Sequence, residues 1–188
     1  MNKCILFFIC LLLSITTTTN IFAQEAERHL GCFSAKGRNA DKNTIADPAE
    51  NNYDIKYVKL NLNMTNTATT VSGNSITKAV VLSSSLSQYV FELLNVLTID
   101  SVLINGINCV VTTSEDVRTA NILAPISSGS LFTAQVFYHG TPPSGGLYSA
   151  LGINTLISPS LGASVTFTLS ESYHAKEWWP CKQSLKDK

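Results

Sequence analysis

The sequence predicts an all-β fold, either a β-sandwich or one large, curved antiparallel sheet. Two observations lead to this class. Short runs rich in Val, Ile, Thr and aromatic residues recur at close spacing, with Gly, Pro, Asn and Asp between them. After the first 23 residues, no window of 12 or more residues carries the apolar stripe of an amphipathic helix.

The chain begins with a stretch that is typical of a secretory signal peptide. Lys3 supplies the positive start, and residues 5–13 form an unbroken apolar run that is too short to span a bilayer. Ala23 is a suitable small residue before a cleavage site. We therefore predict a signal peptide over residues 1–23, a secreted or periplasmic location, and no transmembrane segment after its removal.

Residues 24–50 show weak periodicity and mixed charge. This pattern predicts a leader or linker with little order of its own. Alternation of apolar and polar residues begins at Tyr53, and a single β domain is predicted over residues 51–188.

The first predicted strand covers residues 53–64, YDIKYVKLNLNM. Its apolar side chains alternate with polar ones, as expected for a half-buried strand. The alternation shifts by one position along the way, which predicts a β-bulge near Val58. The inward-facing set would be Tyr53, Ile55, Tyr57, Leu60, Leu62 and Met64.

Further strands are predicted at short spacing along the rest of the chain. The pair Asn105-Gly106 stands between two β-branched runs and predicts a tight hairpin, because both central residues must take positive φ. Glycine and proline mark a loop at residues 140–146. The predicted strands cover residues 71–82, 88–94, 98–104, 107–113, 119–124, 131–139, 153–157 and 165–169.

Charge and cysteine content limit the partners and cross-links. The chain has 13 basic and 13 acidic residues, and this zero net charge argues against a nucleic-acid partner, which would need a clustered basic surface. Two of its five cysteines lie in the predicted signal peptide. Cys32, Cys109 and Cys181 remain, and an odd number leaves at least one thiol free. Which of them pair, if any, stays open.

The sequence contains no self-sufficient active site. The histidines are His29, His139 and His174, and none belongs to an HExxH motif that would bind zinc beside a glutamate base. GxSxG, P-loop and GxGxxG motifs are also missing. We predict no catalytic residue and no metal ligand in this chain, and no peptidase activity from the chain alone.

Four stretches of the chain carry a family pattern. Three are weakly specific: residues 53–64, LTIDSVLINGINC at 97–109, and VFYHGTPPSGGLYSA at 136–150. The fourth, residues 168–188, fits Thr-Gln-x-Glu-x-x-x-Ala-Arg-x-x-Phe-Pro-Cys-x-Asp-x-Pro-x-x-Lys without a gap. Lys176 stands for the Arg, and Leu169, Gln183 and Leu185 depart from the pattern. The residues that fall at matching positions, with Trp179 at the place of the Phe, are Thr168, Glu171, Ala175, Trp179, Pro180, Cys181 and Lys188.

In this respect the chain resembles the N-terminal domain of the aminopeptidase N family of zinc metallopeptidases. The resemblance implies a saddle-like β domain that ends before its last strands and before the zinc-binding catalytic domain. It implies a non-catalytic substrate-cleft and scaffold role in an exported enzyme that removes N-terminal residues from peptides. The implied partners are the parent enzyme's catalytic domain, which would hold the zinc, and the peptide substrate. Glu171 would bind the α-amino group of that peptide.

The segment that follows Glu171 has a structural interpretation and an alternative one. Adjacent Trp178 and Trp179 carry much apolar area, so at least one is expected to be buried as an anchor toward a neighbouring domain, together with Pro180. Cys181 is expected to be a buried thiol rather than a nucleophile. Alternatively, the chain is a secreted, non-enzymatic β-sandwich that binds carbohydrate or a protein partner, with the tryptophans as its platform.

Overall fold

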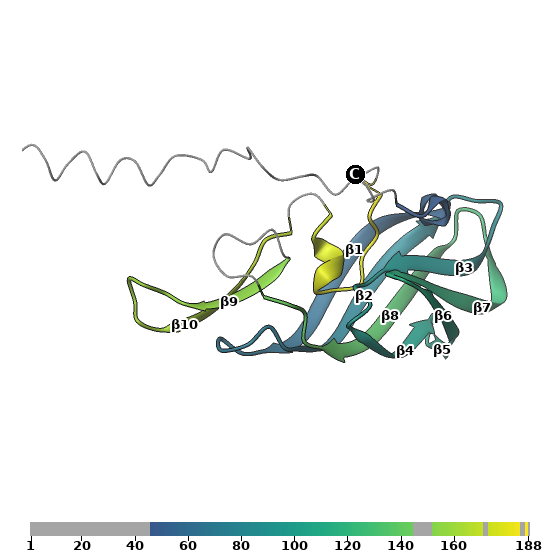
Figure 1. Ribbon diagram of the computed structural model, residues 1–188. Helices are drawn as coiled ribbons and strands as arrows, with labels where there is room; N and C mark the ends of the chain where they lie inside the picture. The colour runs from purple at the N-terminus through teal and green to yellow at the C-terminus, as the bar shows by residue number, and fades with distance from the viewer. Residues whose placement is uncertain (1–45, 145–151, 171–172, 185–186, 188) are drawn as a thin grey trace, which may run out of the picture. The chain divides into compact units, whose positions relative to one another are not determined.

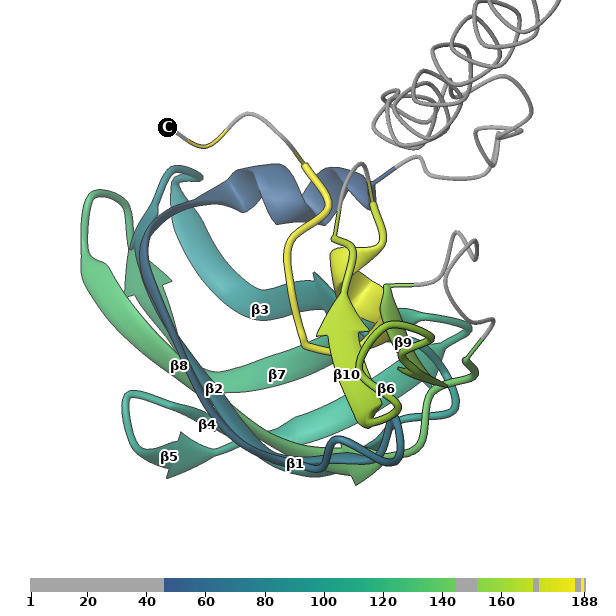
Figure 2. The same ribbon diagram turned by 90° about the vertical axis from the view of Figure 1, so that its left-hand side faces the viewer.

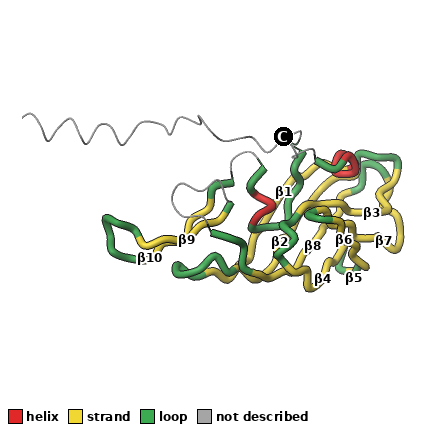
Figure 3. The backbone as a smooth tube through the Cα atoms, in the orientation of Figure 1, coloured by secondary structure: helices red, strands yellow, loops and turns green. Residues whose placement is uncertain are grey.

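The computed structural model describes residues 46–144, 152–170, 173–184 and 187 of the chain. The predicted signal peptide, most of the predicted leader, Cys32 and Glu171 lie outside the described residues. Within them the all-β prediction is confirmed: the chain forms antiparallel sheets of five, three and two strands. Figure 3 shows how little of this part is helical. The described helices are 3₁₀ helices of five and three residues, and none could cross a membrane.

Two sheets pack face to face around one core. The five-stranded sheet has the order β1-β2-β8-β4-β5, and the three-stranded sheet has the order β3-β7-β6. Figure 2 shows both curving around a shared interior. The larger sheet contains β1 (Tyr53–Met64), β2 (Val71–Val81), β8 (Leu131–Gly140), β4 (Thr98–Ile104) and β5 (Ile107–Asn108). The smaller contains β3 (Ser85–Glu92), β7 (Val117–Ser127) and β6 (Val110–Ser114).

An aromatic cluster fills the space between these sheets. The Tyr53 ring lies 5.1 Å from Tyr89 and 6.0 Å from Phe132, centroid to centroid. Tyr89 stacks on Phe91 in the same strand. The Tyr53 hydroxyl donates to the carbonyl oxygen of Val90 at 2.7 Å, so its polar atom is satisfied. Each such buried ring contributes roughly 1.5–3 kcal/mol through removal of apolar area from water, and the cluster joins the two sheets.

The predicted bulge in β1 is confirmed, but it lies slightly earlier in the strand than predicted. The register against β2 shifts between Ile55 and Tyr57, ahead of Val58. Tyr57 therefore falls on the outer face, where it is 49% exposed. The prediction that Tyr57 faces inward is wrong, because the extra residue inverts the alternation before Tyr57 and not after it.

The Asn105-Gly106 hairpin is confirmed, but the strand after it is not one strand. Asn105 and Gly106 have φ of 50° and 82°, as the tight turn requires. After two residues paired with β4, the chain leaves the larger sheet at Cys109. It continues as β6, which pairs with β7 in the smaller sheet. The predicted strand 107–113 thus crosses from one sheet to the other, which alternation cannot reveal.

Other predicted strands are found with shifted ends. β3 starts three residues earlier than predicted, and β7 extends to Ser127. β9 (Ile153–Ile157) and β10 (Ser164–Thr168) form the separate two-stranded hairpin seen beside the β1–β2 turn in Figure 1. The Asn66 side chain in that turn donates to the Ser164 carbonyl oxygen at 3.1 Å.

The folded part begins before the predicted boundary at residue 51. A 3₁₀ helix, Pro48–Asn52, precedes β1, and the Asp47 carboxylate caps it by accepting the Ala49 N–H at 2.9 Å. Glu50 in this helix is fully buried. Residues 48–50 therefore belong to the folded domain and not to a leader.

Candidate functional site

The segment from Thr168 to Ser184 carries the most specific sequence pattern. It leaves the end of β10, passes through the 3₁₀ helix Ala175–Glu177 and reaches the sandwich at Cys181. Glu171, the predicted substrate contact, and Ser172 lie outside the described residues. The flanking residues Ser170 and Tyr173 are described, and the contacts around them define how this segment is held.

Glu177 joins the residues that precede Glu171 to those that follow it. One carboxylate oxygen of Glu177 accepts the Gly152 N–H at 2.5 Å, and the other lies 2.7 Å from Nδ1 of His174. Gly152 in turn accepts the N–H of Leu169 at 2.9 Å through its carbonyl oxygen. The strand end before Glu171 and the turn after it are thus tied to the same carboxylate.

The turn after Glu171 uses an unusual backbone conformation. Tyr173 has a φ of 82°, a region that non-glycine residues seldom occupy and that costs on the order of 1–3 kcal/mol. The contact between His174 and Glu177 follows directly. Surrounding contacts therefore hold a strained turn next to the predicted substrate contact, as is common at functional sites.

Lys176 fastens the segment to the sandwich. Its ammonium lies 2.6 Å from Oε2 of Glu92 and 3.3 Å from Oδ2 of Asp116. Its carbonyl oxygen accepts the Leu94 N–H at 2.8 Å. Burial by itself would lower the pKa of Lys176, but Glu92 and then Asp116 raise it above its ordinary value. The lysine that replaces the family arginine is thus a charged clamp to β3 and to the β6–β7 turn.

The two tryptophans have different environments. The indole N–H of Trp178 donates to Oγ of Ser170 at 3.0 Å, and its carbonyl oxygen accepts the Tyr138 hydroxyl at 3.0 Å. Trp179 is half-buried and packs against the core of this same domain. The two rings meet edge to face at 6.3 Å, centroid to centroid. They do not form one flat surface.

Pro180 and Cys181 are both buried. Cys181 forms a two-way backbone bridge with Glu92, with N···O distances of 2.8 and 3.0 Å. Burial and the nearby carboxylates of Glu50 and Glu92 raise the pKa of its thiol well above the usual range. A thiol in this state stays protonated near neutral pH, which makes it a structural residue and not a nucleophile. Cys109 is also a free, buried thiol.

Glu50 contacts the end of this segment, and the sequence interpretation missed it. Its Oε2 accepts the N–H groups of Gln183 and Ser184 at 2.8 and 3.1 Å, while its Oε1 is buried without a hydrogen-bond partner. Burial raises the pKa of Glu50 to about 7, against the two backbone hydrogen bonds. Asp47-Pro48 is a helix-start signature that could have placed Glu50 in the fold.

A second residue that the sequence interpretation missed, Lys182, completes the attachment of the segment. Its ammonium donates to the Tyr53 carbonyl oxygen at 2.8 Å and to Asp187 at 2.7 Å, above the Tyr53 ring. Gln183, which departs from the family pattern, donates its side-chain amide to Sγ of Cys181 at 3.2 Å. Both ends of the folded part therefore meet beside the aromatic cluster.

The described residues do not provide a metal site. Among them, no three His, Cys, Asp or Glu side chains gather closely enough to hold an ion. His139 pairs with the exposed Asp100 at 2.8 Å, and His174 pairs with Glu177. Zinc does not fit the donor groups that this part of the chain presents.

Comparisons with known proteins place the fold. No protein-family model and no curated protein matches the sequence. Among solved structures, an M1 zinc metallopeptidase from Deinococcus radiodurans matches with a TM-score of 0.58 and 20% identity, over 72% of this chain and 30% of that chain. A variant of it bound to a Tyr-Ser-Ala substrate gives a TM-score of 0.61, with the same identity and coverage.

A eukaryotic structure shows the same likeness. Leukotriene A4 hydrolase from Saccharomyces cerevisiae matches with a TM-score of 0.59 and 15% identity, over 86% of this chain and 25% of that chain. The chain thus has the fold of the N-terminal part of M1 zinc metallopeptidases, at low sequence identity. It spans about a third or less of the length of the structures that it matches.

Proposed function

We propose that the chain is the non-catalytic N-terminal domain of an exported zinc aminopeptidase, where it forms one wall of the substrate cleft. The coincidence of two properties carries the proposal: the chain shares its fold with the N-terminal part of M1 zinc metallopeptidases, and it carries the family-like pattern at 168–188. The fold and the pattern are separate properties of the chain.

In this proposal Glu171 binds the free α-amino group of the peptide. A carboxylate facing an ammonium in a partly dry cleft makes a charge-assisted hydrogen bond. The contacts that hold the flanking residues support this role. Ser170 is bonded to Trp178, and His174 is bonded to Glu177. A substrate contact needs such a fixed frame, since a small displacement weakens the positioning of the reacting group.

The catalytic chemistry belongs to the rest of the parent enzyme in this proposal. That part would supply the zinc and the HExxH motif, and it would be the main protein partner of this domain. The predicted signal peptide over residues 1–23 supports export. The alternative, a carbohydrate-binding module, has less support, because the indole N–H of Trp178 is already bonded and the two rings are not coplanar.

Changing Glu171→Gln in the complete enzyme tests this role. The loss of one charge-assisted hydrogen bond, about 1.5–3 kcal/mol, should lower kcat/KM for a peptide with a free amino terminus roughly 10- to 100-fold. The ratio of kcat/KM for the free peptide to kcat/KM for the N-acetylated peptide should fall by the same factor. Hydrolysis of a chromogenic aminoacyl substrate and of its N-acetylated counterpart gives both kcat/KM values.

The matched control is Glu115→Gln. Glu115 is an exposed carboxylate in the β6–β7 turn, so its replacement should leave these values unchanged. Equal kinetics of the Glu171→Gln enzyme and the parent would remove Glu171 from the site. An intact enzyme that prefers N-acetylated peptides would overturn the aminopeptidase assignment itself.

A further inference from the structure

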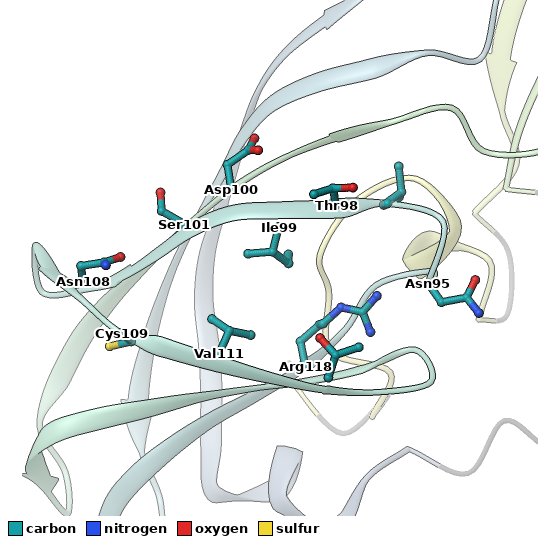
Figure 4. Close-up of a pocket in the computed structure, with 11 residues that line it drawn as sticks. Asn95, Thr98, Ile99, Asp100, Ser101, Asn108, Cys109, Val111 and Arg118 are labelled. Atoms are coloured by element: carbon teal, nitrogen blue, oxygen red, sulfur yellow. The ribbon is translucent and has the colours of Figure 1, made fainter.

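A cavity of about 420 Å³ opens between β4 and β6. Its volume lies within the range of pockets that hold small molecules. Figure 4 shows Ile99 and Val111 pointing into it from the two facing strands, with Arg118 at one end. Both strands lie at the margin of their sheets: β6 is an edge strand, and β4 is followed only by the two-residue β5.

Arg118 is placed where a core residue would be expected. It lies in β7 opposite Phe91 of β3 and Thr113 of β6, and it is only 2% exposed. Its guanidinium donates to the carbonyl oxygen of Glu115 at 2.5 Å and to those of Val117 and Leu94 at 3.4 Å each. Two of these three bonds are therefore long.

The charge of Arg118 has no close counter-ion in the described part of the chain. No described carboxylate comes within 4.0 Å of it. The nearby Asp116 is already engaged by Lys176 and by the Asn95 N–H. Arginine stays protonated and offers five N–H donors, so donors remain for a further acceptor. Asp116 still attracts the guanidinium, but its carboxylate is shared with Lys176, so an anion in the adjoining cavity would add a counter-charge to a buried cation.

The remaining lining determines the kind of anion. Ile99, Val111 and Leu97 supply apolar surface beside the guanidinium. No lining residue besides Arg118 is cationic, and the acidic lining residue, Asp100, pairs with His139. The other lining residues are mostly polar, and Ile99 and Val111 form an apolar strip among them. The cationic Arg118 beside this strip suits a monoanion with a compact apolar body. These features disfavour a phosphate, which carries more charge and no apolar part.

We propose that this cavity binds a small organic monocarboxylate, held at its carboxylate by Arg118 and at its apolar body by Ile99 and Val111. This inference goes beyond the proposed role as a substrate-cleft domain and does not depend on it. The guanidinium fork matches a carboxylate geometrically, and a hydrogen bond between two charged groups is stronger than one between neutral groups.

The test uses 3-methylbutanoate as the probe and 3-methylbutanamide as its uncharged isostere. Each is titrated into the full chain, and amide shifts are followed by NMR. The expected result is a saturable shift of β4, β6 and β7 signals, with the carboxylate bound at least about 10-fold more tightly than the amide. Equal affinities, the absence of saturation or shifts elsewhere would overturn the proposal. So would displacement of the probe by chloride or phosphate at comparable concentrations.

A matched pair of variants tests the location. Val111→Phe fills the cavity and should abolish binding. Val110→Phe changes the next residue, which is 75% exposed and does not line the cavity, and it should bind the probe like the parent. Arg118→Gln should reduce the affinity for 3-methylbutanoate to that for the amide. If Arg118→Gln does not fold, the comparison with 3-methylbutanamide and the two valine variants still test the proposal. Unchanged binding by folded Val111→Phe would place the ligand elsewhere.

Discussion

Gly152 occupies a position that no side chain can share. A Cβ atom added there would lie 2.1 Å from the carbonyl oxygen of His174 and 3.1 Å from Cβ of Glu177. The carbonyl oxygen is part of the backbone, so it cannot move aside as a flexible side chain could. This contact explains why the chain can bring the strand end at Leu169 and the turn at His174 onto the same carboxylate.

Replacement of Gly152 by alanine should therefore destabilise the domain by about 2 kcal/mol, since overpacking of this kind typically costs 1–3 kcal/mol. Urea unfolding followed by tryptophan fluorescence measures the effect. Trp178, which is bonded to Ser170 in this segment, should report the change directly. A variant as stable as the parent would show that the segment can shift away from Gly152.

Neither Gly152 nor Tyr173 could have been picked out from the sequence. Gly152 is one of several glycines in and after the loop at 140–146 and carries no motif that marks it. Tyr173 likewise gives no sign of its positive φ, because tyrosine has no preference for that region. Both depend on contacts between residues that are distant along the chain.

The 3₁₀ helix Ala175–Glu177 depends on its attachment to the sandwich. It has only three residues, and its N-cap residue makes no side-chain capping bond. Its Lys176 instead reaches Glu92, which is 5% exposed. An element this short has little stability of its own, so the ion pair and the Cys181 bridge hold it in place.

Removing one partner of this pair should be more harmful than removing both. Lys176→Met leaves the buried Glu92 carboxylate without its cation and should cost about 3 kcal/mol. Adding Glu92→Gln to that variant should recover most of the loss. A double-mutant cycle by chemical denaturation gives the coupling. Additive effects of the two changes would mean that the charges do not stabilise each other.

The strands were largely predictable, and their assignment to sheets was not. The predictions for β4 and β9 agree with the structure to the residue, since β-branched runs bounded by turn residues mark strand ends well. The crossing at Cys109 was missed because a period of two is the same in either sheet. Only the pairing of β6 with β7 distinguishes the two possibilities.

At the scale of the whole domain, one carboxyl group joins the first described helix to the last segment. Glu50 lies in the first described helix and binds the backbone of Gln183 and Ser184. The sequence interpretation placed it in a leader, because a single charged residue near a terminus is usually solvated. Its burial follows from the return of the last segment across the sandwich, which no local pattern shows.

Glu50 should make the stability of the domain dependent on pH. Its pKa is about 7 in the folded state and 4.5 in the reference state, so the folded state binds more protons between these values. Stability contributed by this group is therefore greatest below pH 4.5 and decreases as the pH rises toward 7, by at most about 3 kcal/mol. Unfolding by urea at a series of pH values measures this slope.

Glu50→Gln should remove that slope, because the amide does not titrate and can still accept the two N–H groups. Glu115→Gln, in an exposed turn, should keep it. Identical pH profiles for Glu50→Gln and the parent would mean that another group is responsible.

The bond between Glu50 and Gln183 spans 133 positions of the chain. During synthesis, the helix that carries Glu50 leaves the ribosome long before its partner has been made. Closing so long a loop is entropically unfavourable, and contacts of this separation slow folding. The contact that ties the first described helix to the last segment can therefore form only as a late event. Until residues 183 and 184 are available, the Glu50 carboxyl group of a nascent chain lacks the two backbone N–H groups that hold it in the finished domain.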